Sequence, residues 1–133
     1  MSHVLEGYYQ LVKITATSVG AAATDAYLQA SAGELWEIHY CFGKQDDGAV
    51  ACYWLWTDET VTDEVIGNIT GAQNAPFHLG AHNKEPSDIE HWYAPPIVTA
   101  NKYFTFRFVA SGAGKIGTIV AFVRKFRGVP SNL

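Results

Sequence analysis

The amino-acid sequence predicts an all-β fold, an antiparallel β-sandwich of jelly-roll-like type with about eight short strands. Its apolar residues alternate with a period of two, as they do in strands that bury one face. Turn-forming residues separate the apolar runs at intervals of about ten residues, which is typical of sandwiches and jelly rolls. Helix signals are scarce: only residues 19–29 (VGAAATDAYLQ) could coil, and their capping and periodicity are poor.

The clearest strand in the first half covers residues 34–42 (ELWEIHYCF), whose alternation predicts a single core face. That face is expected to carry Trp36, Ile38, Tyr40 and Phe42. The next run, residues 49–57 (AVACYWLWT), is apolar on both faces. Such a strand belongs in the middle of a sheet, covered on each side by a second layer or by another subunit.

The turn between these two strands (KQDDGA, residues 44–49) predicts a hairpin. Cys41 and Cys52 flank that turn. They are expected to be reduced thiols of the core, because two cysteines are too few for a disulfide framework and the cytosol is reducing. A disulfide across the hairpin is the alternative.

Two further strands lie near the C-terminus. Residues 103–109 (YFTFRFV) alternate so that three phenylalanines share a core face, and residues 118–126 (TIVAFVRKF) are expected to complete a hairpin with them. The segment between them, GAGKIG at 112–117, matches the pattern G-x-G-x-x-G. Nucleotide-binding loops of that pattern need a following helix, so the glycines are instead assigned to a hairpin loop with positive φ.

Weaker strand signals occur at 8–16, 25–31, 60–67 and 96–99. No repeat, linker or low-complexity tract divides the chain. The sequence therefore predicts one domain over residues 1–133, in which residues 1–7 form a possible N-terminal arm and residues 128–133 a short C-terminal tail.

Composition disfavours several classes of function. The net charge of −4 disfavours a nucleic-acid partner, because binding phosphate requires a clustered excess of Lys and Arg. No apolar run approaches the ~18 residues of a membrane span, and the N-terminus lacks the pattern of a signal peptide, so synthesis in the cytoplasm is expected. The only basic cluster is RKFR at 124–127, a solvated strand end or a docking patch for an acidic partner.

No catalytic residue is predicted. The sequence has no G-x-S-x-G nucleophile elbow, and both cysteines fall within apolar strand patterns. Adjacent carboxylates such as Asp46 and Asp47 point to opposite faces of a strand or face water in a turn, so they do not indicate a catalytic pair. The sequence predicts neither an enzyme nor a cofactor.

The stretch PFHLGAHNKEPSDIEHW, residues 76–92, holds three of the five histidines. His78 and His82 are four residues apart and His91 follows, but Pro76, Gly80 and Pro86 exclude the helix that would place them on one face. No metal is therefore predicted. The stretch is interpreted as a contact loop whose histidines make association pH-sensitive near their ordinary pKa of about 6.5.

Tryptophan adds a second hypothesis. Trp36, Trp54 and Trp56 lie in strand patterns and are expected in the core. Trp92 and Tyr93 stand outside such a pattern, so they are expected to be exposed in the free subunit and covered at an interface. Stacking on a carbohydrate is the alternative role for these aromatic rings.

Two phrases resemble small β-sandwich structural proteins of tailed bacteriophage virions. YLQASAGELWEIHY, at 27–40, is similar to the strand opening x-A-G-E-x-W-x-I of those proteins. PPIVTANKYFTFRFVASGAGKIGTIVAFVRKF, at 95–126, is similar to their second half, although TAN at 99–101 stands where glycine is more usual. The histidine-and-glutamate metal motif of cupins, another jelly-roll class, is absent from the sequence.

The resemblance implies a non-enzymatic virion component, a capsid decoration or cement protein that is often trimeric. Its partners would be copies of itself and the major capsid protein, and its location the virion. The alternative is a carbohydrate- or receptor-binding module, lectin-like in its use of loops. The residues expected at the binding interface are Trp92, Tyr93, His78, His82, His91, Arg124, Lys125 and Arg127.

Overall fold

The computed structural model describes residues 7–48, 50–57, 64–69, 73–78 and 95–129, and these contain nine strands and no helix. The strands are β1 (Tyr8–Gly20), β2 (Ala23–Leu28), β3 (Glu34–Gln45), β4 (Cys52–Thr57), β5 (Glu64–Ile69), β6 (Asn74–His78), β7 (Ile97–Val98), β8 (Tyr103–Val109) and β9 (Gly112–Arg127). No helix long and apolar enough to cross a membrane occurs in these ranges.

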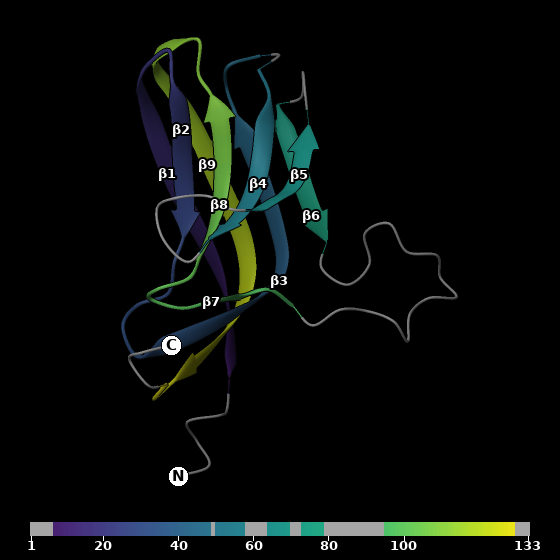
Figure 1. The fold of residues 1–133 in the computed structure, drawn as a ribbon. Coiled ribbons are helices and arrows are strands. Elements are labelled where there is room, and N and C mark those ends of the chain that lie inside the picture. The colour runs from purple at the N-terminus through teal and green to yellow at the C-terminus, as the bar shows by residue number, and fades with distance from the viewer. Residues whose placement is uncertain (1–6, 49, 58–63, 70–72, 79–94, 130–133) are drawn as a thin grey trace, which may run out of the picture.

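The strands form two antiparallel sheets that face each other (Figure 1). Sheet A has the order β1-β9-β3-β6, with β7 pairing to the start of β3, and sheet B has the order β2-β8-β4-β5. Chain-distant strands therefore lie side by side in both sheets. This order is that of a jelly roll, so the predicted sandwich is confirmed, although β1, β3 and β9 are longer than the short strands expected.

The core lies between the sheets and is dominated by aromatic residues of sheet B. Phe104, Phe106 and Phe108 of β8 are fully buried, as their alternation predicts. Trp54 of β4 stacks on Phe104 at a centroid distance of 5.1 Å, and its indole N–H donates to the carbonyl of Ala75 at 3.2 Å. Sheet A contributes smaller side chains to the same cluster: Ile38, Cys41, Ile119, Ala121 and Val123.

Both predicted hairpins are wrong. β3 lies in sheet A and β4 in sheet B, so the turn at 44–49 joins the two sheets. β8 and β9 are likewise in opposite sheets, and β9 begins at Gly112, inside the glycine-rich segment. Turn residues reverse the chain in the same way whether the next strand pairs with the previous one or crosses to the facing sheet, so the local signal could not distinguish them.

The predicted core face of residues 34–42 is half wrong for a different reason. The register between β3 and β9 shifts between Ile38 and Tyr40, which marks a β-bulge. Before the bulge Trp36 and Ile38 point into the core as expected; after it Cys41 is buried instead, and Tyr40 is exposed. One extra residue therefore exchanges the two faces of the second half of the strand.

Among the weaker signals, β1, β2 and β7 confirm strands near 8–16, 25–31 and 96–99, and β5 covers the part of 60–67 that the structure describes. Residues 74–78 form an edge strand paired to β3, whereas the sequence predicted a loop from Pro76 onward. Proline is tolerated there because an edge strand leaves one row of backbone groups unpaired.

Two glycines of sheet A allow the phenylalanines of sheet B to approach its backbone. A Cβ atom placed on Gly43 would lie 2.5 Å from a ring carbon of Phe106, and one on Gly117 would lie 2.5 Å from a ring carbon of Phe108. These contacts are shorter than real Cβ atoms make. Glycine is therefore required at both positions to close the core.

We predict that Gly43→Ala lowers the free energy of unfolding by about 1–3 kcal/mol, because the methyl group overpacks the core against Phe106. Gly20→Ala is the matched control, since no atom lies within 4 Å of a Cβ at Gly20. Urea unfolding of the wild type and both variants measures the effect. Equal midpoints for the two variants would contradict the close approach.

Candidate functional site

The outer face of sheet A, away from the core, carries a continuous group of apolar side chains. The register places Leu11 of β1, Phe122 of β9 and Tyr40 of β3 in one row across the sheet. Val120 and Phe42 form part of the next row. With Tyr9, these residues define what we call the aromatic face: Tyr9, Leu11, Tyr40, Phe42, Val120 and Phe122.

The aromatic face is open to solvent. Leu11 is 65% exposed, Tyr9 52% and Phe122 41%. Tyr9 stacks on Phe122 with ring centroids 5.3 Å apart and planes within 7°, and it contacts His39 edge-on at 5.4 Å. An antiparallel sheet that faces water usually presents polar side chains there. Apolar residues gathered on one exposed face instead indicate an interaction surface.

Sheet B provides the contrast. On its outer face Arg107 binds Asp25 through two hydrogen bonds, Nε to Oδ1 at 2.7 Å and Nη2 to Oδ2 at 2.8 Å. These contacts with Asp25 raise the pKa of Arg107, and Tyr27 donates to the same carboxylate at 3.4 Å. The same face also carries Tyr27 and Tyr103, whose rings meet edge-on at 5.6 Å. Among the described residues, more large apolar side chains are exposed on the aromatic face of sheet A, which is the stronger candidate for binding.

Charged side chains border the aromatic face. Lys13 pairs in register with Val120, and Lys44 with Thr118, at one end of the face. Glu37 pairs in register with Arg124 at the other end, and its carboxylate is 3.1 Å from His39 Nε2. The face therefore offers apolar contact at its centre and charge at its ends.

The basic cluster predicted as an interface at Arg124, Lys125 and Arg127 is divided between the two faces of β9. Arg124 lies over the rings of Tyr9 and Phe126, at 5.7 and 5.0 Å. On the other side, Lys125 lies 4.1 Å from the centroid of the Trp36 ring, while Arg127 contacts Glu34 and the Tyr8 hydroxyl. The three cations do not form one patch, and each is supported by an aromatic ring.

Most of the predicted contact loop lies outside the described residues. This applies to His82, His91, Trp92 and Tyr93. The backbone of His78 ends β6, in register with Tyr40, and therefore lies beside the aromatic face. The histidine prediction stays a prediction.

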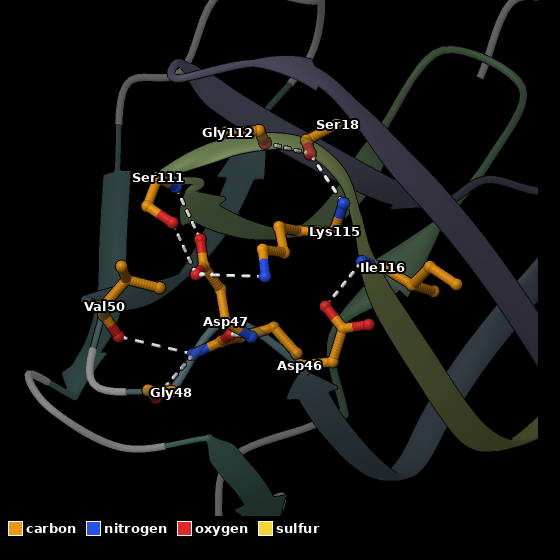
Figure 2. Close-up of polar contacts among 10 residues, drawn as sticks. Ser18, Asp46, Asp47, Gly48, Val50, Ser111, Gly112, Lys115 and Ile116 are labelled. Atoms are coloured by element: carbon orange, nitrogen blue, oxygen red, sulfur yellow. Dashed lines mark hydrogen bonds and ion pairs between the residues drawn. The ribbon is translucent and has the colours of Figure 1, made fainter.

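A second group of polar contacts joins the two connections between sheets at one end of the sandwich (Figure 2). The Asp47 carboxylate accepts hydrogen bonds from the backbone N–H and the hydroxyl of Ser111, and Lys115 Nζ is 4.0 Å away. The Ser111 hydrogen bonds lower the pKa of Asp47, and the nearby lysine adds to the effect. We call Asp47, Ser111 and Lys115 the inter-sheet latch.

The glycine-rich segment belongs to the same end of the molecule and is not built for phosphate. The Ile116 amide donates to Asp46 Oδ1 at 2.8 Å, and the Lys115 amide donates to Ser18 Oγ at 2.9 Å. Protein oxygens thus occupy two of the N–H groups that a phosphate loop would present. Gly114 has a φ of 82°, as predicted for a glycine of this segment.

An open depression of about 410 Å³ lies beside the latch. It is lined by six residues with polar side chains and by Ile116: Lys44, Gln45, Asp46, Gln73, Asn74, Ile116 and Thr118. Carboxylate, amide and ammonium groups next to an apolar side chain suit a small polar ligand better than an apolar one.

The two cysteines offer no reactive site. Cys41 and Cys52 are fully buried and no disulfide joins them, which confirms them as core thiols. Burial raises the pKa of both thiols, so the reactive thiolate is disfavoured. Within the described ranges, no group of three or more His, Cys, Asp or Glu is placed to hold a metal ion.

Fold and surface together define a jelly-roll β-sandwich whose sheet A has an apolar outer face. Comparison with models of protein families and with the sequences of curated proteins finds no match for this chain. Its function therefore has to be inferred from its own residues.

Sequence reasoning missed the aromatic face, although the signal was present. Val120 and Phe122 alternate with the buried Ile119, Ala121 and Val123, so β9 is apolar on both faces, as residues 49–57 were recognised to be. The other half of the face needs the bulge in β3, which turns Tyr40 and Phe42 outward. No pattern in the sequence marks that bulge.

We predict that Asp47→Asn lowers the thermal unfolding midpoint at neutral pH, because the neutral amide is a weaker acceptor for Ser111. The pKa of Asp47 is lower in the folded chain, so its stabilising effect is present above the unfolded pKa of about 3.9 and is lost as pH falls through the folded value. The difference between variant and wild type should shrink below about pH 4.

Asp46→Asn is the matched control, because Asp46 accepts an amide hydrogen bond that asparagine can keep. Calorimetry between pH 3 and 7 should show a smaller change for this variant. A wild-type advantage over Asp47→Asn that is the same at pH 3 and pH 7 would disprove the ionic character of the latch.

Proposed function

We propose that this chain is a structural subunit of a bacteriophage virion, a decoration or cement protein that binds the capsid shell and stabilises it. The observation that carries the proposal is the exposed aromatic face on a jelly-roll sandwich. A surface of this kind is suited to burial against protein. The resemblance of residues 27–40 and 95–126 to such phage proteins supports the same class.

The mechanism would be mass action. A subunit that binds the assembled shell more tightly than it binds separated shell proteins stabilises the assembly by its binding free energy. The function requires a stable scaffold with a large contact surface, and no bond is made or broken. Its partners would be the major capsid protein and copies of itself, and it would be located in the virion after synthesis in the host cytoplasm.

The proposal predicts that purified particles contain this polypeptide in a copy number comparable to that of the major shell protein. Quantitative mass spectrometry of a particle fraction measures the ratio. Particles from which the protein has been removed should lose genome at a lower temperature than complete particles. Absence from the particle, or only a few copies in each, would disprove the decoration role.

A second candidate is a carbohydrate- or receptor-binding module, which the polar depression beside the latch favours. Its amide and carboxylate groups could accept and donate hydrogen bonds to sugar hydroxyls, and Ile116 could pack against a sugar ring. Most such contacts would come from the exposed Asp46, Gln73 and Asn74.

This second candidate predicts selective binding on a glycan array, reduced at least about tenfold by Asn74→Ala, since a lost polar contact leaves its partner group unpaired. Phe122→Ala, on the aromatic face, is the matched control and should leave glycan binding unchanged. An array without selective binding would dismiss the module.

A further inference from the structure

Two opposite charges on the aromatic face, Lys13 and Glu37, lie on opposite sides of Phe122, and Arg124 lies beside Glu37 in the same row. Lys13 lies on β1, the neighbour of β9 on one side, in the row of Val120, which is next to the row of Phe122. Glu37 lies on β3, the neighbour of β9 on the other side, in the row of Arg124, which is next to the row of Phe122 in the opposite direction. With strands about 4.8 Å apart and residue pairs about 6.8 Å apart along a strand, each lies roughly 8 Å from Phe122, in opposite diagonal directions.

The other diagonal of the face is aromatic. Tyr9 lies one strand from Phe122 in the row of Arg124, and Phe42 lies one strand away on the other side, in the row of Val120. Tyr9 and Phe122 already stack on each other. Phe122 is thus the crossing point of an aromatic diagonal and a charged one.

This arrangement is self-complementary under a two-fold axis. If the axis lies in the contact plane along the aromatic diagonal, Lys13 of one copy falls beside Tyr40 and roughly 6 Å from Glu37 of the other copy, within reach of a lysine side chain. The same pair forms a second time. An isologous contact repeats every interaction in this way. Tyr9, Phe122 and Phe42 would lie on the axis, where each ring approaches its own copy.

The geometry of sheet packing is compatible with that axis. From the strand and residue spacings, the strands of the two facing sheets would cross at roughly 70°, which is close to the orthogonal class of sheet packing. All residues of the aromatic face lie within β1, β3 and β9, so no turn projects from the middle of the face.

We infer that the aromatic face is the contact between two copies of this chain, related by a two-fold axis through Phe122 and held in register by reciprocal Lys13–Glu37 pairs. The charge arrangement favours a second copy over an unrelated partner, because the face supplies its own complement. The role of this dimer in a virion rests on the proposed function, whereas its geometry rests on the strand register alone.

Charge exchange tests the pairing. Sedimentation equilibrium of the full chain should give a wild-type dimer. Lys13→Glu and Glu37→Lys should each weaken the dimer about tenfold or more, because each places two like-charged pairs in the contact. The double variant K13E/E37K should return to within about threefold of the wild type, since both pairs form again with reversed sign.

Lys44→Glu is the matched control for charge. Lys44 borders the same face but does not lie on the charged diagonal, so K44E/E37K should not regain the affinity lost by E37K. For the apolar contact, Phe122→Lys should abolish the dimer, whereas Val19→Lys, at a residue 95% exposed and outside the face, should not. Circular dichroism and thermal unfolding confirm that each variant folds.

A wild-type monomer or trimer in solution would overturn the inference, and so would a double variant no tighter than the single ones. Neither result bears on the mass-spectrometric count of subunits in virions. The converse result is a wild type that dimerises and a K13E/E37K variant that restores the dimer, while the protein is absent from virions. That result would support this contact and overturn the proposed function.

Discussion

The pairing of β9 with both β1 and β3 is the constraint on which the rest of the structure depends. β9 runs over Gly112–Arg127 at the centre of sheet A, and its neighbours come from the first third of the chain. Its backbone groups are satisfied on both sides only when those distant segments have come together. This non-local pairing fixes the jelly-roll order, and it directs every connection at the latch end across the sandwich.

The same strand contributes to both the core and the exposed aromatic face. The inward residues of β9, among them Ile119 and Val123, pack against the phenylalanines of sheet B, while Val120 and Phe122 look outward. A hydrophobic core between the sheets requires only one apolar face of sheet A. The second apolar face lies outside the core, and it is the feature on which the proposed contact function rests.

At the latch end, polar side chains hold segments of the chain together by hydrogen bonds. Asp47 accepts hydrogen bonds from Ser111 and so joins the two inter-sheet connections. Asp46 and Ser18 accept from the Ile116 and Lys115 amides of β9. Carboxylates at these amides also disfavour an anionic ligand there by charge repulsion. The glycine-rich segment, whose pattern resembles that of a phosphate loop, therefore has a structural role.

The sequence by itself determined the fold class, the phenylalanine face of β8 and the burial of the two thiols, because alternation and apolar composition act within a single strand. Only the tertiary structure decided that two predicted hairpins are crossings between sheets, that a bulge turns Tyr40 and Phe42 outward, and that Lys13 and Glu37 lie on opposite sides of Phe122. Those features depend on which distant strands pair and in which register. Periodicity along one segment carries no information about its partner, so the candidate surface became visible only when three separate strands lay side by side.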